Sequence, residues 1–151
     1  MIKLHKLVAS VGGIGYIKKG GGTAAAVLVC VLYLFIPAGY LTDVRQFFLL
    51  IVVTAIGVWS GNVVDSIWGK DSSKVVIDEV AGMMISLLLI PLTWKYILVS
   101  LILFRFFDIA KPLYIRKMEK LPKGFGVMAD DVLAGFYSLI LMQVIRIYHV
   151  F

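Results

Sequence analysis

The chain has 151 residues, of which 61% are hydrophobic and 16% are charged, whereas soluble domains are about 45–50% apolar and about 25% charged. Together with a mean hydropathy of +0.97, this excludes an ordinary soluble globular domain and predicts a single integral-membrane domain over residues 1–151. The formal net charge of +6 comes from short segments between apolar runs, with no basic helix or arm, so we expect anionic lipid headgroups as partners and no nucleic acid.

The first segment is basic and rich in glycine. Lys3 and Lys6 open it, and the small residues 23–26 come before the first long apolar run. A cleaved signal peptide has the opposite order, so we expect this segment to stay in the mature protein. Consecutive glycine amides at a helix N-terminus, beside Lys18 and Lys19, can cradle a phosphate. A flexible connector is the alternative, because the segment lacks a Gly-Lys-Ser/Thr ending.

Five apolar runs follow, and each predicts a helix: Thr23–Leu41, Phe47–Trp68, Val75–Leu92, Trp94–Ile109 and Val132–Ile147. No alternation typical of strands competes with this interpretation. Some runs are shorter than the about 20 residues that span a bilayer core. We therefore predict an all-α, polytopic membrane bundle of about five helices that cross or enter the bilayer, and such a bundle is also compatible with a homo-oligomer.

The distribution of charges predicts an orientation. If the N-terminus is cytoplasmic and all five runs cross, 12 Lys and Arg residues lie on the cytoplasmic side and 3 on the other. This asymmetry follows the positive-inside rule. Eight of the nine acids lie on the same side, and only Asp43 lies opposite. We therefore expect any chemistry at the cytoplasmic face.

The first acidic cluster precedes the third run. Ser72 or Ser73 is placed to cap the helix that carries Asp78 and Glu79. Gly82 follows Asp78 by four residues, so the two share a helix face and the glycine permits close approach of a helix or headgroup. The alternative role for these acids is to complement the helix dipole.

The second acidic cluster repeats this pattern before the fifth run. A segment of small residues, expected to be a loop, precedes Asp130 and Asp131, and Gly135 follows Asp131 by four residues. Two acidic pairs that start parallel helices at one membrane face are able to converge on a divalent cation. Carboxylates suit Mg²⁺, which also binds substrate phosphate. Salt bridges to nearby lysines are the alternative.

The third cluster has both signs of charge. Arg105, Asp108 and Lys111 recur every three residues and share a helix face before Pro112. This spacing is typical of a structural salt bridge or of a phosphate-facing site. The neighbouring phenylalanines make unpaired charges costly there, which favours either specific role over a solvated surface.

Three strings in this order resemble the phosphatidylglycerophosphatase A family: residues 76–82, 104–112 and 124–135. The glycine segment before Thr23 also corresponds, so the resemblance covers nearly the whole chain. That segment departs from the family's usual Pro-Lys-Ala-Pro-Gly-Thr, because Lys18 and Gly21 stand at the two proline positions.

The resemblance implies a bacterial inner-membrane enzyme that uses Mg²⁺ to convert phosphatidylglycerophosphate to phosphatidylglycerol and phosphate. It also implies roles for particular residues. The catalytic set is Asp78, Glu79, Asp108, Asp130 and Asp131, the metal ligands come from Asp78, Glu79, Asp130 and Asp131, and the substrate contacts are Arg105, Lys111, Lys19 and Thr23.

Two other functions compete with this hypothesis. Intramembrane acids in a helical bundle also serve ion- or proton-coupled transporters. Against a transporter, the outer halves of the predicted helices carry almost no polar groups. The alcohol phosphotransferases of phospholipid synthesis also use paired acids, but their Asp-Gly-x-x-Ala-Arg signature is absent from the sequence. For hydrolysis itself, the sequence leaves both water and a carboxylate open as the nucleophile, with water preferred.

Overall fold

The computed structural model describes residues 1–37, 39–69, 72–118 and 120–148. Asp71 and Glu119, two of the acids expected at the cytoplasmic face, lie outside these ranges. The described residues form helices and no strands. In chain order the elements are α1 (Ile2–Ala9), η1 (Ile14–Tyr16), α2 (Gly21–Phe35), α3 (Asp43–Trp68), α4 (Ile77–Ser86), α5 (Trp94–Ala110), α6 (Ile115–Met118) and α7 (Lys123–Ile147).

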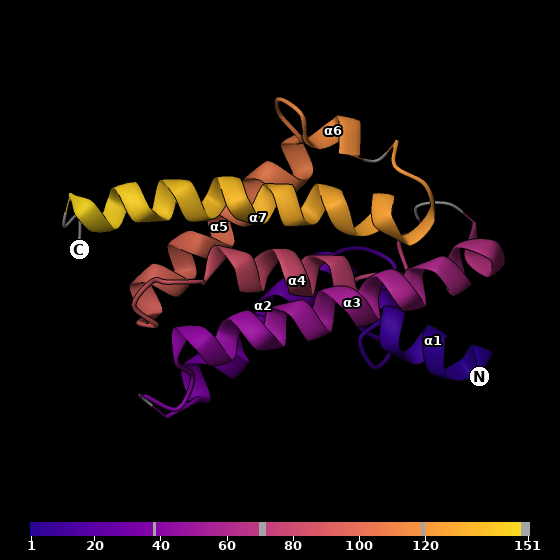
Figure 1. Ribbon diagram of the computed structural model, residues 1–151, viewed down its shortest axis with the longest axis horizontal. Coiled ribbons are helices and arrows are strands. Elements are labelled where there is room, and N and C mark those ends of the chain that lie inside the picture. The colour runs from indigo at the N-terminus through magenta and orange to yellow at the C-terminus, as the bar shows by residue number, and fades with distance from the viewer. Residues whose placement is uncertain (38, 70–71, 119, 149–151) are drawn as a thin grey trace.

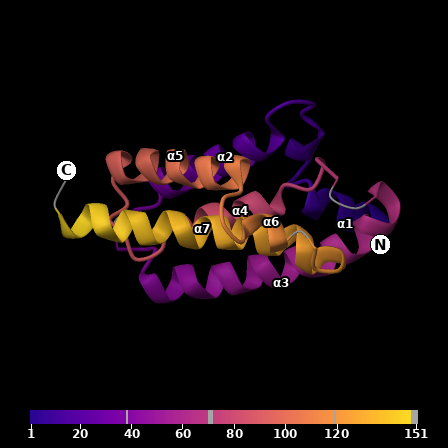
Figure 2. The ribbon, with the colours of Figure 1, turned by 90° about the horizontal axis from the view of Figure 1, so that it is seen from above.

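The helices form a layered bundle around α4. Helices α2 and α5 lie on one side, α3 lies on the other, and α4 and α7 lie between them (Figures 1 and 2). Helices α2, α3, α4, α5 and α7 alternate in direction, and the short helix α6 lies in the connection between α5 and α7. Helices α4 and α7 therefore run parallel. One end of the bundle therefore gathers the starts of α2, α4 and α7 and the end of α5.

Each of the five apolar runs overlaps one helix of the structure, and four of these helices extend beyond their runs. The third helix is shorter than its run, because α4 ends at Ser86 and Leu89 adopts a positive φ of 60°. Helices α3 and α7 are long and apolar enough to cross a membrane. Helices α2, α4 and α5 have 15, 10 and 17 residues, fewer than the about 20 that span a bilayer core. The number of crossings therefore stays a prediction.

The expected serine cap of α4 is wrong. Helix α4 has Val76 at its N-cap, and no side chain caps it. The backbone N–H of Val76 instead donates to the carbonyl oxygen of Ala9 over 2.9 Å. The segment before α4 is therefore held against the end of α1.

The expected loop before Asp130 is also wrong, because residues 124–129 belong to α7. Gly124 packs on α3: a Cβ at this position would lie 2.5 Å from the carbonyl oxygen of Val58. The backbone N–H of Gly124 donates to Oδ1 of Asn62 over 3.0 Å. Packing against α3 and this hydrogen bond stabilise a helix that the glycine content alone disfavours.

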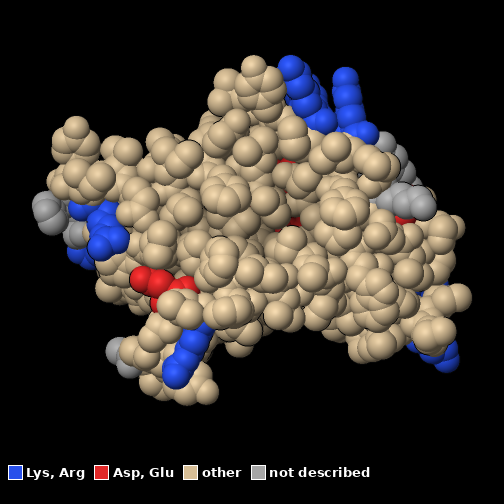
Figure 3. Space-filling model, in the orientation of Figure 1, with Lys and Arg blue, Asp and Glu red and all other residues tan. Residues whose placement is uncertain are grey.

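The outer surface of the bundle is largely apolar. Phe48 is 64% exposed, Ile102 59% and Ile140 58%. Lys and Arg lie at the edges of the face shown in Figure 3, and the area between them is mostly uncharged. An exposed apolar belt of this extent is costly in water and matches a lipid environment.

Candidate active site

Three carboxylates from two helices meet at one end of the bundle. Asp78 and Glu79 lie in the first turn of α4, and Asp131 lies in α7. Oxygen atoms of the three side chains lie within 4.8 Å of one another. Asp131 is buried, with 3% of its surface exposed.

Two glycines explain why the carboxylates meet. Gly82 and Gly135 each follow an acid by four residues, and they lie where α4 crosses α7. A Cβ on Gly82 would lie 2.6 Å from the carbonyl oxygen of Asp131, and a Cβ on Gly135 would collide with the carbonyl oxygen of Gly82. Only glycine permits this spacing, so the shared pattern of acid and glycine brings Asp131 to the level of Asp78.

The three carboxylates offer a set of hard oxygen ligands. Oδ1 of Asp78 accepts a hydrogen bond from the backbone N–H of Glu79 over 3.1 Å. Oε2 of Glu79 is buried and has no hydrogen-bond partner among the described residues. Crowded, buried carboxylates repel one another unless a cation offsets their charge. The donor set and the unpartnered oxygen fit Mg²⁺.

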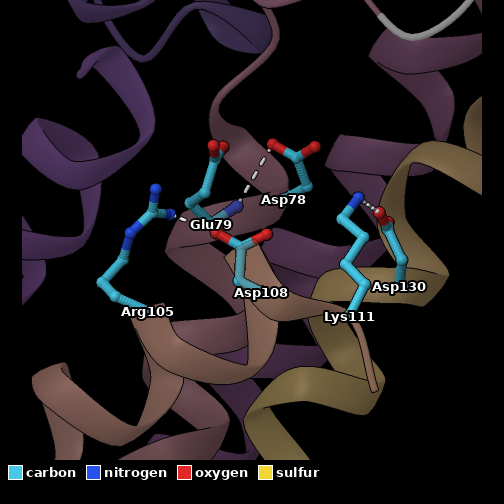
Figure 4. Close-up of polar contacts among 6 residues, drawn as sticks. All are labelled: Asp78, Glu79, Arg105, Asp108, Lys111 and Asp130. Atoms are coloured by element: carbon cyan, nitrogen blue, oxygen red, sulfur yellow. Dashed lines mark hydrogen bonds and ion pairs between the residues drawn. The ribbon is translucent and has the colours of Figure 1, made fainter. Parts of the chain in front are cut away.

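Arg105 and Asp108 reach the cluster from the last turns of α5. Nη1 of Arg105 donates to Oδ2 of Asp108 in an ion pair. Asp108 is 9% exposed and lies within electrostatic reach of Asp131 and Glu79. Nε of Arg105 is buried and has no hydrogen-bond partner in the described part of the chain. Figure 4 shows Arg105 and Asp108 beside Glu79.

Lys111 and Asp130 form a second ion pair next to the first. Lys111 ends α5 in the left-handed conformation, with φ 44°. Its Nζ lies 2.6 Å from Oδ2 of Asp130, a buried residue of α7 (Figure 4). Asp130 therefore pairs with a cation and is not in the trio of Asp78, Glu79 and Asp131. Its predicted role as a metal ligand stays a prediction.

The glycine segment packs against the acidic helix. Gly15 lies against the backbone of Lys74, and a Cβ on Gly22 would collide with Oε1 of Glu79. Helix α2 thus starts beside Glu79, where the positive end of its dipole favours a carboxylate. Lys19 and Thr23 flank this helix start and are exposed.

The sequence did not identify Gly22 as a neighbour of Glu79. The available signal was the glycine run, whose composition favours a phosphate cradle or a connector. The structure shows close packing of two backbone segments, a third reason for glycine.

Comparisons with known proteins show the family of this chain. The chain matches the phosphatidylglycerophosphatase A family over residues 7–146. It is 42% identical over 150 residues to a Bacteroides thetaiotaomicron protein whose name carries a provisional phosphatidylinositol-3-phosphatase assignment, and the match covers 95% of this chain and 94% of the relative. No solved structure matches the chain.

Two shorter matches are to proteins named phosphatidylglycerophosphatase A. The Haemophilus influenzae protein is 50% identical over 78 residues, which cover 50% of this chain and 48% of the relative. The Escherichia coli protein is 36% identical over 70 residues, which cover 45% of this chain and 41% of the relative.

The fold, the site and these matches define a membrane-associated lipid phosphatase. The chain belongs to the phosphatidylglycerophosphatase A family. Nothing in the comparisons supports the transporter hypothesis.

Proposed function

We propose that this enzyme hydrolyses the phosphomonoester of phosphatidylglycerophosphate to phosphatidylglycerol and inorganic phosphate, with Mg²⁺, in phospholipid biosynthesis. The observation that carries the proposal is the trio of Asp78, Glu79 and Asp131 within 4.8 Å, flanked by the cations Arg105 and Lys111. This arrangement combines ligands for a divalent cation with donors for phosphate oxygens.

Asp78, Glu79 and Asp131 would hold the ion. Bound Mg²⁺ would neutralise phosphate charge and polarise the phosphorus–oxygen bonds. The buried Oε2 of Glu79 without a hydrogen-bond partner in the described structure is the strongest sign of this role, because an unpaired buried carboxylate oxygen is costly.

Arg105 and Lys111 bind and orient the phosphate. Asp108 fixes Arg105 through Nη1, which leaves the buried Nε as a donor for a phosphate oxygen. The Lys111–Asp130 pair places a second cation nearby. Both cations stabilise the negative charge on the equatorial oxygens in the transition state.

The chemical step is a displacement at phosphorus. A water molecule forms a bond to phosphorus while the bond to the lipid oxygen breaks. A side-chain carboxylate takes one proton from the water and then gives this proton to the departing lipid oxygen, which becomes the alcohol of phosphatidylglycerol. We place this reaction at the cytoplasmic face of the bacterial inner membrane.

Phosphate release by detergent-purified protein tests the proposal. The substrates are phosphatidylglycerophosphate, phosphatidic acid and phosphatidylinositol 3-phosphate, each with Mg²⁺ and with a chelator. The third lipid is the competing substrate, because the Bacteroides relative that matches over nearly its full length carries that activity in its name.

We expect Mg²⁺-dependent release from phosphatidylglycerophosphate and much slower release from the other two lipids. Asp78→Asn, purified in the same way, measures contaminating phosphatase. Faster hydrolysis of phosphatidylinositol 3-phosphate would replace the proposed substrate. Full activity in the chelator would overturn the metal requirement.

A further inference from the structure

An apolar groove lies between the end of α5 and the central turns of α7. It has a volume of about 180 Å³ and is lined by Phe107, Leu113, Tyr137, Ile140 and Leu141. Leu113 is 75% exposed and Ile140 58%, so the groove opens on the outer surface of the bundle. The ring centroids of Phe107 and Tyr137 lie 5.7 Å apart, and this edge-to-face contact joins the two helices at the groove.

Both walls of the groove lead to the Lys111–Asp130 ion pair (Figure 4). On α5, the backbone N–H of Lys111 donates to the carbonyl oxygen of Phe107 over 2.8 Å, so these two residues lie one turn apart. On α7, Tyr137 and Leu141 follow Asp130 by 7 and 11 residues, which is about two and three helical turns. The three residues therefore share one face of α7, with Asp130 at its head.

The turn after α5 connects the ion pair to the mouth of the groove. Lys111 and Leu113 have positive φ values of 44° and 58°, which are uncommon for residues other than glycine. With this backbone, Lys111 reaches Asp130 and Leu113 forms part of the groove wall. Strained residues persist where the surrounding structure fixes them, and they cluster at sites that hold ligands.

The groove has the polarity and the length of a phospholipid in one leaflet. Charged groups lie at one end, and every lining residue is aliphatic or aromatic. From Asp130 to Leu141, α7 extends over roughly 16 Å at about 1.5 Å per residue. This length is about half of the hydrocarbon thickness of about 30 Å. Helix α7 is itself long and apolar enough to cross a membrane.

We propose that this groove binds one acyl chain of the phospholipid substrate. The phosphate lies at Arg105 and Lys111, and the chain extends from there past Phe107 and Tyr137 to Leu141. This proposal rests on the proposed function, because it takes Arg105 and Lys111 as the phosphate ligands. The bound chain positions the glycerol backbone beside Lys111 and thereby orients the phosphomonoester for reaction.

A larger groove between α3 and α7 matches a substrate chain less well. It has a volume of about 580 Å³, and none of its described lining residues, which include Thr54 and Phe136, is charged. Helix α5, which carries the two proposed phosphate ligands, contributes no residue to this lining. A Cβ on Gly61 would lie 3.0 Å from Cα of Gly124, so α3 and α7 are in close contact near the Phe125 end of this groove. No cation is therefore available at that end to hold a phosphate.

Photolabelling of the full chain in phosphatidylcholine nanodiscs with Mg²⁺ tests the proposal. The probe is a phosphonate analogue of phosphatidic acid with a diazirine in one acyl chain, which keeps the charged headgroup and cannot release phosphate. Phosphatidylcholine with the same diazirine chain measures contact with bulk lipid. Mass spectrometry maps the labelled residues. We expect the phosphonate to label the α5–α7 groove saturably, and labelled phosphatidylcholine to react along all exposed helix faces without preference.

Matched variants connect the labelling to the groove. Ile140→Trp narrows the groove, and displacement of about two methylene groups should weaken the apparent affinity of the phosphonate about tenfold. Ile102→Trp is the matched control, because Ile102 has nearly the same exposure, 59% against 58%, and lies outside the lining. Its affinity should not change. Leu113→Ser removes part of the wall at an exposed position and should also weaken binding, which keeps the test valid if Ile140→Trp unfolds.

Lys111→Gln tests the connection between the groove and the cation. Loss of one charge-assisted hydrogen bond weakens binding about tenfold, so we expect the groove labelling by the phosphonate to fall toward that by phosphatidylcholine. Equal labelling of the groove by the two probes in the native protein would overturn the proposal. Preferential labelling of the α3–α7 groove, or an unchanged affinity in both Ile140→Trp and Leu113→Ser, would do the same.

The outcomes also separate this proposal from the proposed function, because the labelling does not involve phosphate release. Saturable labelling of the groove without hydrolysis of phosphatidylglycerophosphate would contradict the proposed function alone. Hydrolysis of that lipid, together with equal labelling by the two probes, would contradict the acyl-chain groove alone.

Discussion

Asp131 is the residue that tests the carboxylate trio most directly, because it is the member from α7 and is buried. Asp131→Asn keeps the shape of the side chain and removes one of three negative charges within 4.8 Å. Without Mg²⁺ we expect the variant to unfold at the same temperature as the native protein or a higher one, since like-charge repulsion falls. Phosphate release should fall by more than about 100-fold, the upper range for loss of a supporting residue.

Binding of Mg²⁺ by the trio can be measured separately from activity, by thermal unfolding. A ligand that binds only the folded state stabilises that state by about 2.7 kcal/mol when its free concentration is about 100 times its Kd. Mg²⁺ should therefore raise the unfolding midpoint of the native protein, and raise that of Asp131→Asn much less. An equal rise in both proteins would remove Asp131 from the ligand set. The same measurement on Asp130→Asn decides whether the predicted fourth ligand joins the trio.

Spacing in the sequence predicted part of this site and could not predict the rest. The i, i+4 pairs Asp78–Gly82 and Asp131–Gly135 define shared helix faces, and α4 and α7 meet on those faces. Whether one acid or both acids of a pair face the cluster depends on the rotation of each helix in the bundle. For that reason the sequence did not separate Asp131 from Asp130, which the structure pairs with Lys111.

At the scale of elements, the crossing of α4 and α7 determines the geometry of the trio. In Gly82→Ala the new Cβ would lie 2.5 Å from Phe104 and 2.6 Å from the carbonyl oxygen of Asp131. Backbone cannot move as freely as a side-chain end, so we expect the helices to separate, with a loss of about 1–3 kcal/mol in stability. A displacement of about 1 Å at the site costs about 100-fold in activity.

Gly57→Ala is the matched control for this prediction. Its Cβ would lie 2.6 Å from Sδ of Met128, the far end of a flexible side chain that can adopt another rotamer. We expect this variant to keep its activity and to unfold within about 1 kcal/mol of the native protein. Phosphate release and thermal unfolding check both variants. Equal activity in the two would show that the α4–α7 spacing does not control the site.

The ends of the helices show the limits of hydrophobicity as a signal. The apolar run continues past the end of α4 at Ser86 to Leu92, because the turn that contains Leu89 is itself apolar. Pro91 was the available sign that the helix could not continue through the run. At α7 the error was the reverse: glycines indicated a loop, and packing on α3 overrode that local preference.

At the scale of the whole molecule, the distribution of charges and the direction of the helices together predict which side of the membrane each end of the bundle faces. The carboxylate cluster lies at the end of the bundle where α5 finishes, and Lys95 lies at the end where α5 starts. If α5 crosses the bilayer with the N-terminus of the chain inside, the carboxylate cluster faces the cytoplasm and Lys95 faces the opposite side of the membrane. In this orientation, with all five runs crossing, the 12 to 3 division of basic residues follows the positive-inside rule.

Single cysteines on either side of α5 test this topology in intact cells and in inverted vesicles. The sole cysteine, Cys30, is buried, and Cys30→Ala supplies an unlabelled background. On that background, Lys117→Cys should react with a membrane-impermeant maleimide only in inverted vesicles, and Lys95→Cys only in intact cells. Both lysines are exposed, so accessibility reports the side of the membrane and not burial. Reaction of both from one side would show that α5, with 17 residues, does not cross the bilayer.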